Sequence, residues 1–191
     1  MNIWHDLDKS RVTPESLTAV IEISKGSKMK YELDKKTGLL ILDRVLYTAT
    51  HYPANYGFIP RTYAKDGDPL DILVLCQEPI TPLVLVNCYP IGVLKMIDDE
   101  AMDEKIIAIP HKDPSLSCYN DIHDLPVHLF QEIKHFFEVY KYLENKETVV
   151  EKIMGRDEAL RVISECLVAY EETFGDNYTT NEANKSNNSK D

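Results

Sequence analysis

The sequence predicts an α+β fold in which an antiparallel β-barrel or sandwich is followed by helices. Short apolar runs punctuated by prolines fill the first two-thirds of the 191 residues, and helical periodicity appears only after them. Several short strands with frequent turns and little helix between them favour antiparallel pairing over a parallel sheet. With 43% apolar and 9% aromatic residues, the chain can bury a substantial core. We therefore expect one folded domain.

The predicted strands are short runs of apolar or alternating residues. The segment 29–34, M-K-Y-E-L-D, alternates apolar with polar residues, and the turn K-K-T-G leads from it into the run at 39–46. These two runs are expected to form a hairpin. The other strands are predicted at 18–23, 72–76, 83–86, 91–96 and 105–109.

The last third of the chain predicts two helices and a polar tail. Apolar residues recur every three to four positions from Leu129 to Leu143, which is typical of one amphipathic helix. A second helix is expected to begin near Asp157, which is a good N-cap residue. The end of the chain has almost no apolar residues. We therefore expect a single domain over 1–174 and a disordered tail over 175–191.

The net charge limits the kinds of molecule that the protein can bind, and the cysteines and N-terminal sequence indicate its cellular compartment. The formal net charge of −11 argues against nucleic acid or an anionic membrane surface as a partner, because both depend on basic patches. The four cysteines form no C-x-x-C pair and are interpreted as reduced thiols. The N-terminus has no apolar signal-peptide region, and no apolar run is long enough to span a membrane. A soluble, cytoplasmic protein is expected.

Three carboxylates stand together just before an apolar run. Asp66, Asp68 and Asp71 belong to D-G-D-P-L-D, which leads directly into I-L-V-L-C. A surface turn is the simplest interpretation, because Asp, Gly and Pro are common turn residues. An EF-hand calcium loop does not fit, since its sixth place would be Asp71 rather than Gly and its twelfth would be Gln77 rather than Glu.

A shared metal ion is the functional interpretation of the same stretch. Asp66 and Asp68 are two residues apart, so an extended backbone, which Pro69 favours at Asp68, would point both the same way. Carboxylates this close repel one another unless a hard divalent cation lies among them, and Mg²⁺ binds few carboxylates while keeping waters. A second acidic run, I-D-D-E-A-M-D-E-K, could meet the first at one barrel rim, although a solvated loop is the alternative for Glu100 and Glu104.

The stretch D-G-D-P-L-D-I-L resembles the signature of the soluble inorganic pyrophosphatases, in their single-domain, magnesium-dependent, bacterial type. Further motifs follow in that family's order: V-I-E-I, M-K-Y-E-L-D-K-K-T-G, L-D-R, Y-P-A-N-Y-G-F-I-P, G-V-L-K-M-I-D-D-E-A-M-D-E-K-I-I-A-I-P-H and H-F-F-E-V-Y-K. The resemblance covers roughly residues 12–170. It implies hydrolysis of pyrophosphate to two phosphates, on a small, partly closed antiparallel β-barrel of the OB type flanked by two C-terminal helices. It also implies a homohexamer.

The resemblance implies a role for each residue that matches a family motif. Asp68 matches the residue that accepts a proton from the metal-bound water, and Asp99 stands where some relatives have Glu. The implied metal ligands are Asp66, Asp71 and Asp103 for the activating ions, Asp98 for ions that arrive with the substrate, and Glu22 and Glu32 as outer members of the acidic set. The implied phosphate-holding groups are Lys30, Arg44, Tyr56, Lys105, Tyr140 and Lys141.

The residues themselves support some of these roles and leave others open. Lys30 and Glu32 share one face of a strand that could simply be solvated, and Tyr140 could serve core packing as well as phosphate binding. Arg44 suits bidentate capture of phosphate. The glycine after Tyr56 would let the backbone approach a ligand closely. No role is assigned to His51, His123, His128 or His135.

Other classes of protein find little support in the sequence. A Nudix box, a D-H-H motif and a P-loop are all absent. An OB-like module for single-stranded nucleic acid needs a basic groove with stacking aromatics, which the charge of −11 opposes. An inactive relative would have lost aspartates that are all present here. The predicted reaction is in-line attack on pyrophosphate by a metal-activated water, with Asp68 as general base.

Overall fold

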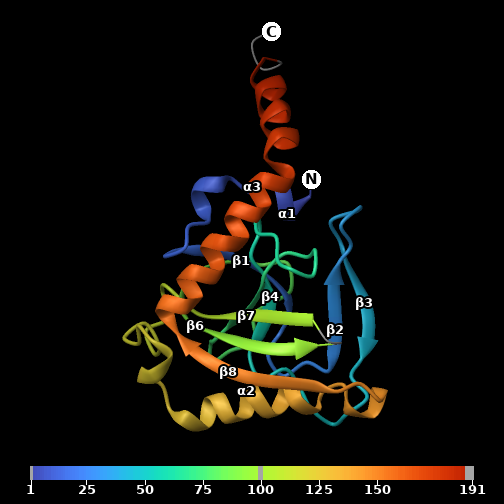
Figure 1. Cartoon of the computed structure of the whole chain (residues 1–191), viewed down its shortest axis with the longest axis vertical. Coiled ribbons are helices and arrows are strands. Elements are labelled where there is room, and N and C mark those ends of the chain that lie inside the picture. The colour runs from blue at the N-terminus through green and yellow to red at the C-terminus, as the bar shows by residue number, and fades with distance from the viewer. Residues whose placement is uncertain (1, 99–100, 188–191) are drawn as a thin grey trace.

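A sheet that closes on itself forms the centre of the computed structural model, which describes residues 2–98 and 101–187 (Figure 1). Its strands pair in the order β1-β4-β5-β7-β6-β8. Their bounds are β1 Leu17–Ile23, β4 Asn55–Phe58, β5 Asp71–Val74, β6 Leu85–Asp98, β7 Ala101–Pro110 and β8 Thr148–Gly155. The first strand, β1, also pairs with β6, with Leu17 opposite Cys88, so the strands form a partly closed ring. The predicted barrel is confirmed.

One pair of strands in the barrel is parallel, although short strands with frequent turns favoured antiparallel pairing throughout. Strand β5 runs parallel to β7, with Asp71 beside Lys105 and Val74 beside Ala108. The other pairs of the ring are antiparallel. The parallel pair matters for function, because it places an acidic residue and a basic residue side by side at one end of the barrel.

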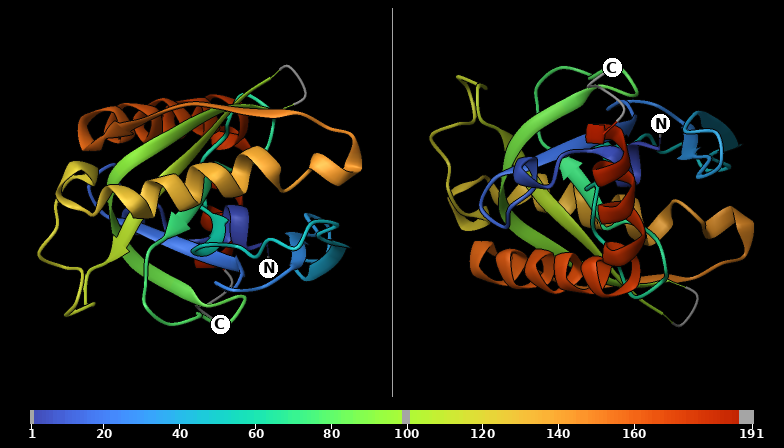
Figure 2. Two further views of the ribbon diagram at one scale, coloured as in Figure 1. Left: turned by 90° about the horizontal axis from the view of Figure 1, so that it is seen from below. Right: turned by 90° about the horizontal axis from the view of Figure 1, so that it is seen from above.

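The predicted hairpin is confirmed as a separate two-stranded sheet. Strand β2, Met29–Leu33, pairs with β3, Leu40–Val45. Both views in Figure 2 place this hairpin beside the N-terminus of the chain. In agreement with this position, the Asn2 side chain donates a hydrogen bond to the carbonyl of Lys35, in the turn between β2 and β3.

Two strands were missed, and two predicted strands are in fact one. The second half of the run predicted at 83–86 and all of the run at 91–96 belong to the single strand β6, which begins at Leu85. Pro90 is tolerated within it because the pairing register with β7 shifts between Pro90 and Gly92, and such an irregularity can accommodate a residue that lacks an N–H. Strands β4 and β8 were not predicted.

Helices cover the barrel after the strands, as expected. The helix α2, Val127–Val139, and the helix α3, Arg156–Asn187, are the two predicted helices, and α2 ends before Leu143. In Figure 1, α2 lies below the strands, whereas α3 crosses in front of them and projects beyond them. The helix α3 continues through Asn187, so most of the segment 175–191, which was expected to be a disordered tail, is helical up to that residue. The shorter elements are α1 Ile3–Asp6 and the 3₁₀ turns η1 Lys9–Arg11, η2 Ile122–Asp124 and η3 Tyr142–Glu144.

Alternate side chains of one barrel strand enter two different cores. Ile107 and Ile109 of β7 pack in a cluster with Phe137 of α2. Ile106 and Ala108 pack in a second cluster, which contains Val162 and other residues of α3. Because both faces of β7 are buried, its sequence is a continuous apolar run rather than an alternating one. Among the residues that the structure describes, none of the helices is long and apolar enough to cross a membrane.

Candidate active site

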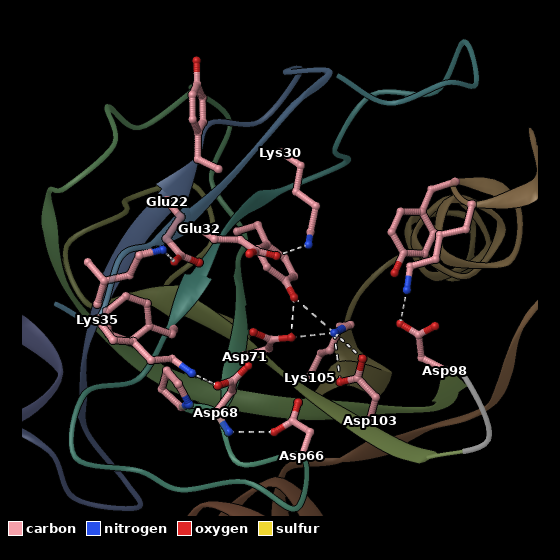
Figure 3. Close-up of a pocket in the computed structure, with 17 residues that line it drawn as sticks. Glu22, Lys30, Glu32, Lys35, Asp66, Asp68, Asp71, Asp98, Asp103 and Lys105 are labelled. Atoms are coloured by element: carbon pink, nitrogen blue, oxygen red, sulfur yellow. Dashed lines mark hydrogen bonds and ion pairs between the residues drawn. The ribbon is translucent and has the colours of Figure 1, made fainter. Parts of the chain in front are cut away.

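A cavity of about 250 Å³ opens between the rim of the barrel and the hairpin β2–β3 (Figure 3). Its lining combines acidic and basic side chains from several strands with the residues that follow α2. Every site residue predicted from the sequence lines this cavity except Arg44. The predicted residues that do so are Glu22, Lys30, Glu32, Tyr56, Asp66, Asp68, Asp71, Asp98, Asp103, Lys105, Tyr140 and Lys141.

The turn between β4 and β5 brings two carboxylates to the cavity. Asp66 Oδ1 accepts a hydrogen bond from the backbone N–H of Asp68 at 3.0 Å, and Gly67 between them has a φ of +86°. Asp side chains commonly close such turns, and glycine adopts positive φ without steric cost. The extended backbone expected from the two-residue spacing is therefore wrong. The two side chains nevertheless both line the cavity.

Lys105 is the buried centre of the site. Its ammonium donates to Asp71 Oδ2 at 2.6 Å, to both carboxylate oxygens of Asp103 at 2.9 Å and to the hydroxyl of Tyr56 at 3.1 Å. Burial alone would lower the pKa of Lys105, but Asp71 and Asp103 outweigh burial and hold that pKa well above its ordinary value. The lysine is therefore charged, and it offsets the repulsion between the two carboxylates.

Burial also shifts the pKa values of the carboxyl groups of Asp103 and Glu22. Burial raises the pKa of Asp103, and the charge of Lys105 partly opposes that shift. Burial and the nearby charge of Asp71 raise the pKa of Glu22 to about 8, although Glu22 also accepts the backbone N–H of Leu33. The neutral carboxyl of Glu22 is therefore favoured at pH 7, which suits an outer position better than direct contact with a cation.

Two tyrosine hydroxyls face the same cavity. Tyr56 donates to Asp71 Oδ2, and burial raises its pKa well above the ordinary value, so it remains a hydrogen-bond donor. Tyr140 packs its ring against Phe136 with a centroid separation of 5.4 Å and also lines the cavity. Burial is the largest cause that raises the pKa of Tyr140. Core packing of Tyr140 is confirmed, and its position in the cavity lining leaves phosphate binding as a prediction.

Two further lysines line the cavity, each beside an acid. Lys30 pairs with Glu32 of its own strand and, at 3.3 Å, with Asp43. Lys141 pairs with Asp98, which ends β6. These pairings place the two lysines within the cavity lining.

Arg44 lies beside the cavity rather than in its lining. Its Nε donates to Glu144 Oε1 at 3.0 Å, and one terminal nitrogen pairs with Asp43. This ion pair joins β3 to the turn η3, which follows α2 closely. The structure thus brings Arg44 to the edge of the predicted site but directs its guanidinium toward two acids.

The donor set of the cavity fits a hard divalent cation. Among the side chains that the structure describes, in 2–98 and 101–175, no three acidic, histidine or cysteine groups are close enough together to hold a metal ion as they are placed. Lysine ammoniums pair instead with Asp68, Asp71, Asp98 and Asp103. Asp98 Oδ1 is buried without a hydrogen-bond partner among these residues. Carboxylate oxygens of this kind are the ligands that Mg²⁺ prefers. Asp99 and Glu100 lie outside the described residues.

Sequence reasoning missed one charged residue of the site. Lys35, in the turn of the β2–β3 hairpin, lines the cavity and pairs with Asp68. Its position in K-K-T-G gives no hint of this role, because the contact joins residues 33 positions apart. Tyr31, Leu33, Phe58 and Pro69 were also not predicted to line the cavity.

The glycine after Tyr56 has a different purpose from the one expected. A Cβ added at Gly57 would lie 2.8 Å from the carbonyl carbon of Val20 and 2.9 Å from Cα of Ile21. Gly57 therefore allows β4 to approach the backbone of β1 closely, rather than allowing a ligand to approach. The role of Tyr56 rests on its hydroxyl and not on its neighbour.

Comparison with known proteins agrees with the motifs and the geometry. A sequence model described as inorganic pyrophosphatase matches residues 19–171. The soluble inorganic pyrophosphatase 2 of Chlamydomonas reinhardtii is 48% identical over 171 residues, which cover 90% of this chain and 89% of that protein. A soluble inorganic pyrophosphatase of Zea mays is 49% identical over 167 residues, which cover 87% of this chain and 78% of that protein.

Solved structures agree with the sequence relatives. The inorganic pyrophosphatase of Helicobacter pylori has a TM-score of 0.83 at 47% identity, covering 87% of this chain and 99% of that one. The inorganic pyrophosphatase of Thermus thermophilus has a TM-score of 0.84 at 41% identity, covering 88% and 99%. Algal, plant and bacterial proteins are thus similarly close, and the similarity does not single out a bacterial type. The chain belongs to the inorganic pyrophosphatase family.

Proposed function

We propose that this chain hydrolyses inorganic pyrophosphate to two orthophosphates in the cavity at the barrel rim, with Asp68 as general base and Mg²⁺ as cofactor. The observation that carries the proposal is the convergence of the aspartates and Lys105 on one cavity of about 250 Å³. A site for a small polyanion needs positive charge and protein-held cations, and the cavity supplies lysines and oxygen ligands together. Membership of the family supports the same substrate.

The carboxylates of the cavity would hold several magnesium ions. When bound, Mg²⁺ lowers the pKa of a coordinated water and offsets charge on the phosphoryl group. We assign Asp66, Asp71 and Asp103 to the activating ions and Asp98 to ions that accompany the substrate. Glu22 and Glu32 form the outer part of the acidic set, and other divalent ions could replace magnesium.

The other residues bind substrate and move the proton. Asp68 takes the proton of the attacking water, and its side chain is 53% exposed at the cavity mouth, where water can reach it. Phosphate oxygens are held so that the water attacks in line with the leaving phosphate, whose charge is spread over the surrounding donors. These donors are Lys30, Arg44, Tyr56, Lys105, Tyr140 and Lys141.

Phosphate release from pyrophosphate is the direct test. We expect release in the presence of Mg²⁺ and its loss when a chelator removes the ion, with activity restored by adding Mg²⁺ back. A phosphomonoester such as glycerol phosphate serves as the control substrate, because it lacks the phosphoanhydride bond. Absence of phosphate release from pyrophosphate under every condition would refute the assignment.

The assembly, the location and the domain boundary belong to the same proposal. A homohexamer is proposed from the resemblance, and light scattering of the purified protein measures its mass. A cytoplasmic location is proposed from the four cysteines, which are interpreted as reduced thiols, and the lack of nucleic-acid or membrane partners is proposed from the net charge of −11. The catalytic domain is proposed to span 1–174, so a chain ending at 174 should retain phosphate release.

A further inference from the structure

Lys35 is a cation at the cavity mouth that no role above includes. It follows β2 in the hairpin turn, lines the cavity, and pairs its ammonium with Asp68, as Figure 3 shows. The side chains of Lys35 and Asp68 are about half exposed, at 48% and 53%. A solute that enters the cavity can therefore reach this ammonium.

The N-terminal segment holds the Lys35 turn in place. The ammonium of Lys35 lies 5.3 Å from the centroid of the Trp4 ring, within the range of a cation–π contact. Asn2 donates from its side-chain amide to the carbonyl of Lys35 at 2.8 Å. Trp4 itself is only 5% exposed, and its indole N–H donates to the carbonyl of Thr62 at 2.9 Å. The cation thus rests on a rigid aromatic platform.

This platform lies outside the part of the chain that the family model matches. The match covers residues 19–171, whereas Asn2 and Trp4 precede it. The contact between the N-terminus and the mouth of the site is therefore a feature of this chain that its matched motifs do not specify.

Lys35 differs from Lys105 in the donors that it can offer to a phosphate. An ammonium has three N–H donors. Lys105 directs its donors to Asp71, Asp103 and Tyr56, and its side chain is only 3% exposed. Lys35 has one carboxylate partner among the described residues, Asp68. Its remaining N–H groups can therefore donate to a phosphate oxygen without leaving Asp68.

We infer that Lys35 is a further substrate-binding residue, held over the cavity mouth by Trp4 and Asn2, whose ammonium pairs with an oxygen of the phosphate nearest to Asp68. This inference rests on the proposed function of the cavity. The contact is made equally with bound substrate and in the transition state, so its loss weakens binding rather than slowing the chemical step.

Steady-state kinetics of three variants test the role. In Lys35→Met, which keeps the length of the side chain and removes the charge, we expect KM for pyrophosphate to rise about fivefold, the size typical of a half-exposed charge contact, with kcat within about twofold of wild type. Lys35→Arg should restore most of the affinity, because it keeps the charge. Lys36→Met is the matched control in the same turn, and its KM should equal that of wild type.

The only tryptophan of the chain, Trp4, gives a second readout that needs no turnover. Methylenediphosphonate, a pyrophosphate analogue that is not hydrolysed, is titrated in the presence of Mg²⁺ while the Trp4 emission is recorded. Binding of the anionic analogue beside the ammonium changes the electric field at the indole, so the emission of wild type and of Lys36→Met should shift. The shift should be lost in Lys35→Met, and calorimetry should show a dissociation constant about fivefold higher.

The results separate this inference from the proposed function. Wild-type values of both KM and the analogue dissociation constant in Lys35→Met would overturn the role of Lys35 while the enzyme remains a pyrophosphatase. Equal losses in Lys35→Met and Lys36→Met would also overturn it, because they would reflect only the general charge of the turn. A wild-type protein that binds the analogue through Lys35 but releases no phosphate would instead contradict the proposed function.

Discussion

The ammonium of Lys105 lies 2.6 Å from Oδ2 of Asp71, and the side chain of Lys105 is only 3% exposed. The parallel pairing of β5 with β7 sets this contact, because it makes the two residues neighbours in the sheet. Asp103, two residues before Lys105 on the same strand, approaches the ammonium from the other side at 2.9 Å. One buried cation therefore holds together two of the proposed metal ligands.

Replacing Lys105 should destabilise the protein in the absence of metal. In Lys105→Met, Asp71 and Asp103 would face each other without a cation, and removal of one partner from a buried ion pair costs about 3 kcal/mol or more. We expect a loss of that size in the free energy of unfolding, measured with urea in the presence of a chelator. Adding Mg²⁺ should recover part of the loss, since an ion that binds only the folded protein stabilises it.

The control for Lys105 is a surface lysine in a helical ion pair. Lys134, on α2, pairs with Glu138 at 3.6 Å and is 49% exposed. Lys134→Met should change the free energy of unfolding by less than about 0.5 kcal/mol. Equal stability losses in the two variants would show that the buried lysine has no special role.

The two aspartates of the turn before β5, and the aspartate that begins β5, should be indispensable for turnover. In Asp66→Asn, Asp68→Asn and Asp71→Asn the side chain keeps its shape and loses its charge. Each should lower kcat by a few orders of magnitude, because a metal ligand or the general base is lost. Rates of phosphate release measure the effect. The control is Asp157→Asn, on the exposed first turn of α3. Near-normal turnover in any of the three test variants would remove that aspartate from the mechanism.

The sequence predicted the site more completely than the sheet. The clustered aspartates and the resemblance of the motifs around them indicated the site residues, and twelve of the thirteen predicted side chains, seven of them acidic, line one cavity. Strand β4 was missed because Asn55–Phe58 is short and buried throughout, so it shows no alternation. Strand β6 was divided at Pro90, since the register shift that accommodates a proline is not visible in sequence.

Contacts between distant segments are the part that the sequence could not supply. The pairing of Lys35 with Asp68 depends on how the hairpin folds over the rim, and the parallel pairing of β5 with β7 depends on the path of the whole barrel. The deflection of Arg44 toward Glu144 joins residues 100 positions apart. Motif spacing can indicate that a basic residue such as Arg44 belongs near the site, but it does not predict which acidic side chain that residue contacts in the fold.

Arg44 should contribute less to catalysis than the aspartates. Its guanidinium is held by Glu144 and Asp43, and it does not line the cavity, so we expect only a peripheral contact with the substrate. In Arg44→Met we expect kcat/KM for pyrophosphate to fall by no more than about 10²–10³-fold. This corresponds to the about 3–4 kcal/mol of transition-state stabilisation that is typical of one charge-stabilising donor. Steady-state kinetics give this value, with Arg11→Met in the 3₁₀ turn η1 as the control. A loss as large as that of Asp71→Asn would contradict the peripheral placement.

Gly57 should not tolerate a side chain. The nearest atoms to an added Cβ belong to the backbone of Val20 and Ile21, which cannot move without disturbing the pairing of β1 with β4. Gly57→Ala should therefore lower the free energy of unfolding by about 3 kcal/mol or more, at the upper end of the range for overpacking. Urea unfolding measures the change. The control is Gly175→Ala, on α3, where the added Cβ meets only the flexible end of Glu171. Wild-type stability in Gly57→Ala would refute the close approach of β4 to β1.

The buried His5 should make stability depend on pH in mild acid. His5, on α1, is 6% exposed, and its Nδ1 lies 2.7 Å from the hydroxyl of Tyr170 on α3. Burial is the main cause that lowers its pKa from 6.5, with Asp6 opposing the shift and Arg61 adding to it. The unfolded chain therefore binds the proton more readily than the folded protein, so stability is full above about pH 6.5 and falls as the pH drops toward the lowered pKa of the folded protein.

Replacing His5 should remove this part of the pH dependence. His5→Gln keeps a group able to bond to Tyr170 but cannot take up a proton, so its free energy of unfolding should change less between pH 7 and about 5 than that of wild type. Urea unfolding at a series of pH values gives both curves. The control is His128→Gln, on a side chain that is 77% exposed, and it should follow the wild-type curve. If His5→Gln kept the full wild-type slope, the acid sensitivity would belong to groups other than the one that joins the N-terminus to α3.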